Sequence, residues 1–307
     1  MGIYLPIAEM SVNFFVLLAM GGAVGFLSGM FGVGGGFLIT PLLIFYNIPP
    51  SVAVATGANQ VVAASASGAL IHMKRGTLDM KLGTVLLVGG VVGSAIGIYI
   101  FALLRSIGQL DLIVSLMYVV MLGSVGSIML VESGRAIRRA RAGGAAELRR
   151  PGQHNWVHKL PLKMRFRSSK LFVSIIPVLG LGAAVGFLGS VLGVGGSFIM
   201  IPAMIYLLKV PTKVVIGTSL FQTVFVSAFT TVVHAVANHT VDIALAFALM
   251  VGGVIGANYG ARAGQRLRGE QLRALLAFLV LAVAVRLAID LFARPVSPFS
   301  LAPLGGA

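Results

Sequence analysis

The sequence contains no cysteine. Disulfide bonds, metal sites with thiolate ligands and cysteine nucleophiles are therefore excluded. Charge is also scarce, because Asp, Glu, Lys and Arg make up only 10% of the 307 residues, whereas a soluble domain carries about 25%. With 58% of its residues hydrophobic, the chain lacks enough polar side chains to cover itself with a water-compatible surface. This shortage of charge predicts a protein embedded in a lipid bilayer.

Acidic residues are rarer than basic ones: the chain has eight Asp and Glu against 23 Lys and Arg, which gives a formal net charge of +15. The carboxylates all fall in loops or at the ends of apolar segments: Glu9, Asp79, Asp111, Glu132, Glu147, Asp242, Glu270 and Asp290. None is placed at the membrane midplane as a cation site, so we expect no metal and no other cofactor. Arg286 lies four residues before Asp290, a spacing that predicts an ion pair near the outer face.

The basic residues are concentrated in one region. Eleven of the 23 Lys and Arg lie between Arg135 and Lys170, in a bias that usually reports membrane orientation rather than nucleic-acid binding. We therefore expect no nucleic-acid partner. The region predicts a cytoplasmic linker with an amphipathic piece on anionic headgroups; a regulatory or partner-binding element is the alternative.

Apolar segments with helical periodicity and a length sufficient to cross about 30 Å of hydrocarbon recur along the whole chain. We expect them at Val12–Met30, Ser51–Ile71, Leu82–Leu104, Leu110–Val131, Leu171–Leu192, Thr212–His234, Val241–Ala261 and Leu272–Phe292. Nothing alternates with a period of two, which disfavours a β-barrel. The first eleven residues contain Glu9 and neither Lys nor Arg, so we expect no secretory signal peptide. The predicted fold class is an all-α polytopic membrane protein.

The sequence repeats itself at a constant offset, with Gly22–Pro41 matching Ala183–Pro202. Further on, His72 matches His234 and Asp79 matches Asp242. The matches divide the chain into a first membrane repeat, a basic cytoplasmic linker and a second membrane repeat, at residues 1–131, 132–170 and 171–307. Each repeat is expected to hold a glycine-broken helical hairpin followed by three transmembrane helices.

The charges of the loops predict that the two repeats have opposite orientations. With the basic linker in the cytoplasm, the loop with Lys74 and Arg75 also lies inside, and the uncharged loop "NIPPS" (47–51) lies outside. Its counterpart in the second repeat, "KVPTK" (209–213), carries two lysines and falls inside. This is the charge pattern of inverted-topology repeats. Each glycine hairpin then begins and ends on one side, either as two crossings or as one re-entrant loop.

Two glycine-rich stretches, "FGVGGGF" and "LGVGGSF", occupy matching places in the repeats. A nucleotide loop is disfavoured because no Lys-Ser/Thr pair and no nearby carboxylate follows. Consecutive glycines break a helix, and broken backbone at membrane depth is tolerated where protein buries it or it lines a cavity. The N–H groups of a helix that starts after the break attract anions. Tight packing alone is the alternative. The candidate substrate-binding residues here are Gly34, Gly35, Gly36, Gly195, Gly196 and Ser197.

A polar cluster follows each glycine stretch, "TGANQ" (56–60) in the first repeat and "GTSLFQ" (217–222) in the second. Amides and hydroxyls in a membrane segment bind a substrate or a neighbouring helix. The candidates are Asn59, Gln60, Thr218, Ser219 and Gln222, and our alignment places Asn59 opposite Ser219. His72 and His234 titrate near neutral pH when unperturbed. They are candidates for proton coupling, with interfacial hydrogen bonding as the alternative.

Glycines spaced four residues apart form further stripes, as in Gly21, Gly25 and Gly29, or Gly89, Gly93 and Gly97. Such small-residue stripes let helix backbones approach closely. The sequence leaves open whether they pack helices within one chain or form the face of a homodimer.

Together, the twin glycine loops with their "F-x-x-x-P" continuation, the two polar clusters and the basic central loop resemble the sulfite exporter TauE/SafE family of membrane transporters. The resemblance implies a multi-pass inner-membrane permease of a bacterium, with two homologous halves and substrates such as sulfite, thiosulfate, sulfoacetate and other organosulfonates. It implicates both glycine motifs, with Asn59, Gln60, Ser219 and Gln222, in binding the anion.

The expected function is a secondary transporter of small sulfur-containing anions that works by alternating access, with export as the favoured direction. Its partners would be the anion and membrane lipid. An anion channel on the same scaffold is the first alternative. A membrane-embedded enzyme is the second, disfavoured because the sequence has no HExxH motif and no nucleophile turn with a matching histidine and carboxylate. We therefore expect no catalytic residues.

Overall fold

The computed structural model describes residues 2–31, 34–141, 163–166, 169, 171–208, 210–264 and 269–293. Eight helices in these ranges are long and apolar enough to cross a membrane. This confirms the predicted all-α polytopic fold. The full-length helices are α1 (Phe14–Phe31), α3 (Pro50–Lys74), α4 (Met80–Ser106), α5 (Leu110–Arg141), α6 (Ile175–Leu192), α8 (Thr212–Val233, continued by the π-helical turn η2, His234–Asn238), α9 (Ile243–Gly264) and α10 (Gly269–Ala293). Two short helices are α2 (Gly36–Phe45) and α7 (Ser197–Tyr206).

A small β-hairpin precedes the helices of each half. Strand β1 (Gly2–Leu5) pairs antiparallel with β2 (Met10–Asn13), and β3 (Lys163–Phe166) pairs antiparallel with β4 (Leu171–Ser174). Sequence periodicity missed them because strands of four residues are too short for a period of two to stand out. The hairpin β3–β4 begins, and α5 ends, inside the range expected to be linker. The predicted headgroup contact belongs to the linker of residues 132–170, of which residues 142–162 lie outside the described residues.

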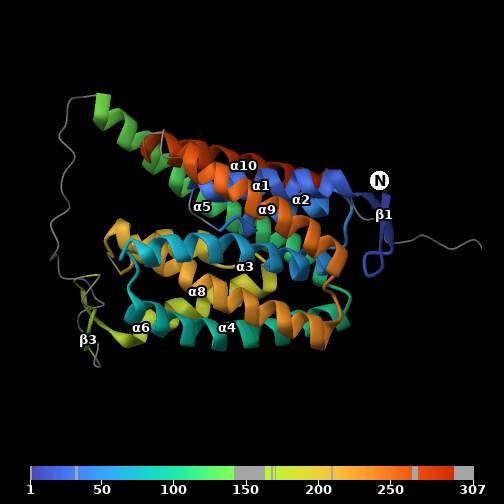
Figure 1. The fold of residues 1–307 in the computed structure, drawn as a ribbon, viewed down its shortest axis with the longest axis horizontal. Coiled ribbons are helices and arrows are strands. Elements are labelled where there is room, and N and C mark those ends of the chain that lie inside the picture. The colour runs from blue at the N-terminus through green and yellow to red at the C-terminus, as the bar shows by residue number, and fades with distance from the viewer. Residues whose placement is uncertain are drawn as a thin grey trace, which may run out of the picture.

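The order of elements in the first half recurs in the second. The bounds of β3, β4, α6 and α7 are those of β1, β2, α1 and α2 moved by one constant offset, the same that carries Gly22 to Ala183. For α3 and α8 the offset is larger by one, since the two helices follow Pro49 and Pro211. For α4 and α9, which follow Asp79 and Asp242, it is larger by two. The hairpin β1–β2 lies at one end of the helix bundle and β3–β4 at the opposite end (Figure 1).

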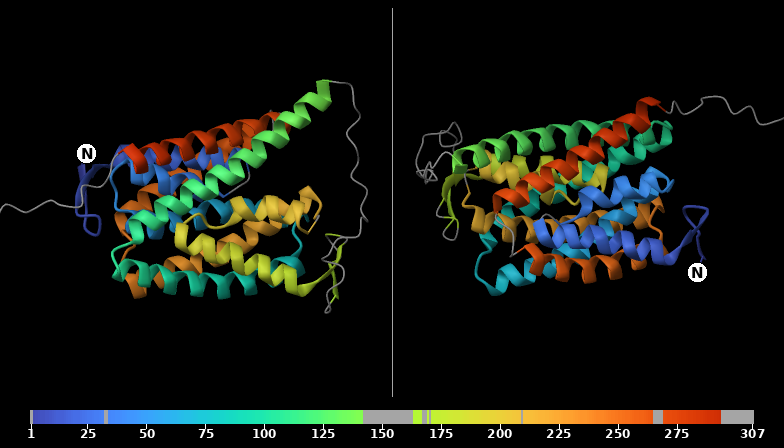
Figure 2. Two further views of the ribbon diagram at one scale, coloured as in Figure 1. Left: turned by 180° about the vertical axis from the view of Figure 1, so that it is seen from behind. Right: turned by 90° about the horizontal axis from the view of Figure 1, so that it is seen from above.

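Helices pack in pairs that each combine one helix from either half. Helix α1 packs along α9, α4 along α6, α3 along α8 and α5 along α10. The α3–α8 pair lies between the α1–α9 pair and the α4–α6 pair (Figures 1 and 2). The centre of the molecule is therefore built by both halves, with α3 and α8 running through it.

The glycine stripes are buried between these paired helices. A Cβ added to Gly25 on α1 would lie 2.2 Å from the carbonyl oxygen of Gly253 on α9. A Cβ added to Gly93 on α4 would lie 1.9 Å from the carbonyl oxygen of Ala183 on α6. Real Cβ atoms do not approach a backbone oxygen so closely, so only glycine permits these contacts. The stripes thus serve helix packing within the chain.

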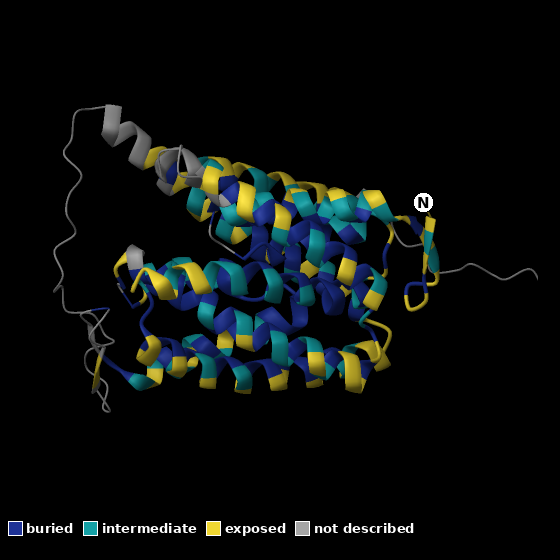
Figure 3. Ribbon diagram, viewed as in Figure 1, coloured by how far each residue is buried: buried dark blue, intermediate teal, exposed yellow. Residues whose placement is uncertain are grey.

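Exposed residues follow the outer surface of the bundle (Figure 3), and many of them are large and apolar. On α4 they form one row, in which Val88, Val92, Ile96 and Tyr99 are each more than half exposed. In water such a continuous apolar surface would drive association, whereas acyl chains of a bilayer cover it. At the end of α10, Arg286 Nε lies 3.4 Å from Asp290 Oδ2, which confirms the predicted ion pair.

Each hairpin is bound to the other half of the chain by one buried carboxylate. Asp79 caps α4 by accepting a hydrogen bond from the N–H of Leu82 (3.2 Å), and its second oxygen accepts from Ser169, between β3 and β4. Asp242 accepts from the N–H of Leu245 (3.1 Å) at the start of α9 and from the N–H of Ile7 (3.2 Å), between β1 and β2. Both carboxylates lie at helix ends, as the sequence predicted.

Candidate functional site

The two short helices begin at backbone breaks made of left-handed glycines. Gly34 and Gly35 have φ angles of 81° and 73°, and Gly195 and Gly196 have 71° and 79°. Residues with a Cβ rarely adopt this conformation, which explains the clustered glycines. The chain then turns back along the preceding helix, since a Cβ added to Gly35 would lie 2.8 Å from the Cβ of Ser28.

Each short helix reaches only about halfway through the hydrocarbon, because its ten residues rise about 15 Å. The preceding helices, α1 and α6, have 18 residues each and rise about 27 Å. Each glycine hairpin is therefore one full-length helix followed by a half-length helix that folds back. Burial places the start of each short helix inside the bundle, because Phe37 is fully buried and Phe198 is 2% exposed.

The two breaks meet at the centre of the molecule. The rings of Phe37 and Phe198, one residue into α2 and α7, stack with centroids 4.5 Å apart and planes at 15°. A Cβ added to Gly36 would lie 2.4 Å from the carbonyl oxygen of Val194, and one added to Gly34 would lie 2.5 Å from Ser197 Oγ. The fold thus brings together six of the residues proposed from the sequence: Gly34, Gly35, Gly36, Gly195, Gly196 and Ser197.

The electrostatics of this centre come from backbone and neutral side chains. Neither α2 nor α7 has a side-chain cap. The N–H groups of Leu38 and Ile199 bond back to the carbonyl oxygens of the glycines that precede the two helices, and each helix start is the positive end of a helix dipole. Two helix starts therefore present partial positive charge to one region. Among the described residues no lysine or arginine is buried, and the buried carboxylates and imidazole, of Asp79, Asp242 and His234, lie at helix ends. The described charged side chains thus lie away from the centre, where the positive ends of two helix dipoles meet.

The two glutamines lie against the outer helix pairs, in equivalent positions. Gln60 on α3 donates from Nε2 to the carbonyl oxygen of Gly21 at 3.4 Å and packs against Gly253. Gln222 on α8 packs against Gly90, where an added Cβ would lie 2.6 Å from its Nε2. The Oε1 atoms of both side chains are buried and have no hydrogen-bond partner. They are the part of each amide that remains available to another group.

Three other members of the polar clusters bond to backbone groups, two of them at the starts of α4 and α9. Thr218 Oγ1 accepts a hydrogen bond from the N–H of Asp79 at 3.2 Å, and Thr56 Oγ1 accepts one from Asp242 at the same distance. This equivalence pairs Thr56 with Thr218, so the alignment of Asn59 with Ser219 was wrong by two positions. Ser219 donates to the carbonyl oxygen of Ile216 at 3.0 Å within its own helix. Asn59 is half-buried on α3.

Comparison with known proteins places this chain in a family. The family model described as "Sulfite exporter TauE/SafE" matches residues 17–287. The chain belongs to the sulfite exporter TauE/SafE family. It is 26% identical to the probable membrane transporter protein YunE of Bacillus subtilis (strain 168), over 90% of this chain and 97% of that protein. No solved structure matches the chain.

Other relatives carry similar names. A probable membrane transporter protein of Xylella fastidiosa (strain 9a5c) is 29% identical over 88% of this chain and 93% of its own length. The sulfite exporter TauE/SafE family protein 1 of Arabidopsis thaliana is 28% identical, over 40% of this chain and 27% of its own. The family model and these relatives show that the chain is a membrane transporter of this family.

Three buried hydroxyls beside the breaks of this TauE/SafE protein were not predicted from its sequence. They belong to Ser65 on α3 and to Thr223 and Ser227 on α8, and none has a hydrogen-bond partner. Ser65 and Ser227 are related by the same offset as Gln60 and Gln222. Extending the repeat alignment beyond the glutamines would have found this pair.

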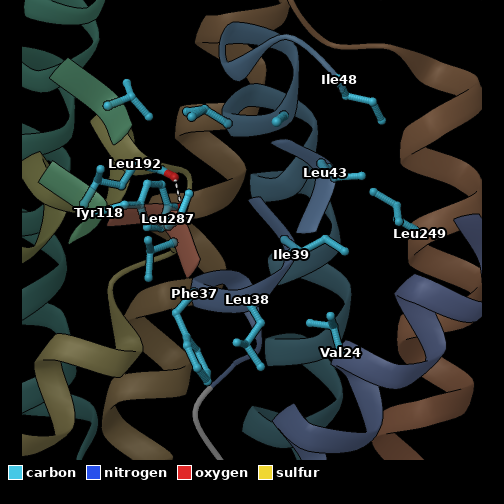
Figure 4. Close-up of a cluster of buried hydrophobic side chains, with 14 of the residues drawn as sticks. Val24, Phe37, Leu38, Ile39, Leu43, Ile48, Tyr118, Leu192, Leu249 and Leu287 are labelled. Atoms are coloured by element: carbon cyan, nitrogen blue, oxygen red, sulfur yellow. Dashed lines mark hydrogen bonds between the residues drawn. The ribbon is translucent and has the colours of Figure 1, made fainter. Parts of the chain in front are cut away.

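The tyrosine hydroxyl of α5 was missed as well. Tyr118 is fully buried and donates to the carbonyl oxygen of Leu192, the last residue of α6 before the second break (Figure 4). A helix leaves its last carbonyl groups without partners, and this bond satisfies one of them. The sequence gives no signal for it, because the two residues are 74 positions apart.

The two histidines lie at helix ends rather than at the breaks. His72, near the end of α3, contacts Thr77 Oγ1 through Nδ1 at 2.8 Å. His234 is buried, with Nε2 3.2 Å from the carbonyl oxygen of Ser190 and Nδ1 2.8 Å from Asn238 Nδ2. Because a carbonyl only accepts and an amide nitrogen only donates, this arrangement suits a neutral imidazole protonated at Nε2.

Proposed function

We propose that this protein is a secondary transporter of small sulfur-containing anions, such as sulfite or an organosulfonate, across the inner membrane of a bacterium. The observation that carries the proposal is the meeting of two helix starts at the centre, where the rings of Phe37 and Phe198 stack at 4.5 Å. Helix starts at membrane depth favour anionic groups. The neutral surroundings attract an anion without trapping it.

The two halves are proposed to be inverted-topology repeats. The recurrence of elements at a nearly constant offset, and the hairpins at opposite ends of the bundle, support this arrangement (Figure 1). In such transporters, access alternates when one group of helices rocks against the other around a fixed site. Here the breaks would be the fixed site, and the paired helices would supply the moving surfaces.

The proposed direction is export, with residues 142–162 in the cytoplasm. The basic residues at described helix ends support this orientation. Lys74 and Arg75 lie at the end of α3, and Arg135 lies near the end of α5. These two helix ends lie on one side of the bundle (Figure 1). In a cell that is negative inside, expulsion of a monoanion is favoured by about 2.3 kcal/mol per 100 mV. Export therefore needs no obligatory coupling to a second ion.

Transport in proteoliposomes tests this function directly. Purified protein would be reconstituted, and uptake of radiolabelled sulfite would be measured with and without unlabelled anion inside the vesicles. We expect saturable uptake that internal sulfite or sulfoacetate accelerates, because a carrier returns faster when it is loaded. Uptake equal to that of empty vesicles, for sulfite, thiosulfate, sulfoacetate and taurine alike, would refute the proposal.

The same vesicles distinguish the two alternatives. A channel on this scaffold would give a flux that rises linearly with the gradient and ignores the anion inside. A membrane-embedded enzyme would convert a sulfonate in detergent solution, where no second compartment exists. Counterflow without conversion of the substrate leaves the carrier as the function.

A further inference from the structure

Three hydroxyls in the centre of the molecule are buried and lack a partner. Ser65 and Thr223 are fully buried and Ser227 is 1% exposed, and the Oγ atoms of the serines and Oγ1 of the threonine make no hydrogen bond. Buried hydroxyls in folded proteins are nearly always bonded, because an unpaired one costs free energy. These three, like the unpaired hydroxyls of Thr40 on α2 and Thr231 farther along α8, therefore require an explanation.

The two serine hydroxyls lie at the glycine breaks, in a symmetric arrangement. A Cβ added to Gly34 would lie 3.0 Å from Ser65 Oγ, and one added to Gly195 would lie 3.0 Å from Ser227 Oγ. Gly34 and Gly195 are equivalent in the repeat, as are the two serines. Each half thus places one serine hydroxyl beside the left-handed glycine that precedes a short helix.

We propose that Ser65, Thr223 and Ser227 are the side chains that bind the oxygen atoms of the transported anion. This inference rests on the proposed transport function and names the donors of its site. The hydroxyls would donate to the oxyanion beside the positive ends of the α2 and α7 helix dipoles. An oxyanion accepts several such bonds, so it supplies the partners that the three hydroxyls lack.

The site is more polar on the α8 side than on the α3 side. Thr223 corresponds to Val61 in the repeat, and the Cγ2 of Thr223 lies 3.1 Å from a Cβ added to Gly195. The methyl groups of Val61 lie 2.4 Å and 2.3 Å from Cβ atoms added to Gly36 and Gly195. The anion would therefore accept two hydroxyl bonds from α8 and one from α3, with Val61 as an apolar wall.

Thermal unfolding and anion binding of purified protein in detergent test the assignment. The variants Ser65→Ala, Thr223→Val and Ser227→Ala each remove one unpartnered hydroxyl. The matched control is Ser94→Ala, because Ser94 is equally buried but bonds Thr230 Oγ1 at 2.7 Å. Sulfite and sulfoacetate are the probes, with acetate for comparison.

The expected results separate binding from structure. Without anion, the three site variants should unfold at or above the wild-type temperature, because each loses an unpaired group, and the control should unfold at a lower temperature. With anion, each site variant should bind roughly tenfold to hundredfold more weakly, the scale of one hydrogen bond to a charged group. The control should bind like wild type. Wild-type affinity in the site variants would overturn the assignment.

Two further outcomes separate failure of the proposed transport function from failure of this assignment. If wild-type protein binds none of the probes, the proposed transport function fails, and this inference falls with it. If a site variant does not fold, Ser65→Cys and Ser227→Cys keep the size of the side chain and introduce the single thiol of a cysteine-free chain. A small thiol reagent should then modify that thiol in a cysteine variant that folds like wild type, and sulfoacetate should slow the reaction. A thiol that does not react, or reacts equally fast with sulfoacetate present, would overturn the assignment.

Discussion

Asp79 accepts two hydrogen bonds from Ser169, one from its N–H at 2.9 Å and one from its hydroxyl at 2.7 Å. The two residues are 90 positions apart and belong to different halves of the chain. The same carboxylate caps α4 and is 2% exposed. One buried side chain therefore joins a hairpin of the second half to a helix start of the first.

Replacing the carboxylate of Asp79 should lower the free energy of unfolding more than its position in a loop suggests. Asp79→Ala removes a helix cap and two charged hydrogen bonds, for an expected loss of about 3 kcal/mol. Thermal unfolding in detergent measures the effect. Asp111→Ala is the matched control, because Asp111 is exposed in the first turn of α5 and its removal should cost only about 0.5 kcal/mol. Equal losses for both variants would contradict the role of Asp79.

Helix packing gives a second prediction within one helix. A Cβ added to Gly186 on α6 would lie 2.1 Å from the carbonyl oxygen of Gly90, whereas nothing lies within 4 Å of one added to Gly180. Gly186→Ala should force α4 and α6 apart and destabilise the protein by about 2 kcal/mol or more. Gly180→Ala should be neutral or stabilising by about 0.5 kcal/mol, since alanine favours the helix. The measurement is thermal unfolding in detergent, and equal unfolding temperatures for the two variants would contradict a tight contact at Gly186.

Much of this fold was predictable because membrane helices have a local sequence signal. Apolar runs predicted the eight long helices, and the repeated glycines predicted the two breaks. The spacing of Arg286 and Asp290 predicted their ion pair. The hairpins at Gly2–Leu5 and Lys163–Phe166 could not be seen, because pairing rather than periodicity defines strands of four residues.

The candidate site was harder to predict, because its members are related by contacts over long distances in the sequence. The second half has one extra residue before α8, and our alignment allowed for it in the wrong direction, which matched Asn59 to Ser219. Shifted correctly, the repeat pairs Thr56 with Thr218 through their bonds to Asp242 and Asp79. That Ser65 lacks a hydrogen-bond partner is a property of packing, which no local pattern contains.

Inverted topology makes a third prediction, on the accessibility of matching loops. Asn47 follows α2, and Leu207 follows α7 and is 48% exposed. Because the chain has no cysteine, Asn47→Cys and Leu207→Cys each carry one thiol. A membrane-impermeant maleimide should label Asn47→Cys in intact cells and Leu207→Cys only in permeabilised ones. Gly76→Cys, between α3 and α4, is an inside control. Labelling of both loops from one side would contradict inverted repeats.

The histidines give a fourth prediction. Both ring nitrogens of His234 have partners that suit a neutral ring, and His72 contacts Thr77. We therefore expect His72→Gln and His234→Gln to lower stability while leaving unchanged the dependence of sulfite transport on a pH gradient. Transport by the two variants and wild type would be compared in vesicles with equal and unequal pH on the two sides. A pH-gradient response that disappears in either variant would assign proton coupling to that histidine.

The glycine breaks give the last prediction, in which a matched control separates backbone strain from function. Gly195 and Gly108 have nearly the same φ, 71° and 75°, so alanine at either position incurs a similar strain of about 1 kcal/mol. Only at Gly195 does the new Cβ also meet the site, 2.3 Å from Val61 Cγ1, whereas Gly108 has open space.

Gly195→Ala should therefore abolish sulfite counterflow, while Gly108→Ala should transport like wild type at a slightly lower unfolding temperature. Both proteins would be reconstituted at equal density, and their folded fractions checked by size-exclusion chromatography before the flux is compared. Loss of transport in both variants would mean that strain alone disables the carrier. Full transport by Gly195→Ala would show that the anion passes elsewhere, because a methyl group 3.0 Å from Ser227 Oγ would then obstruct nothing.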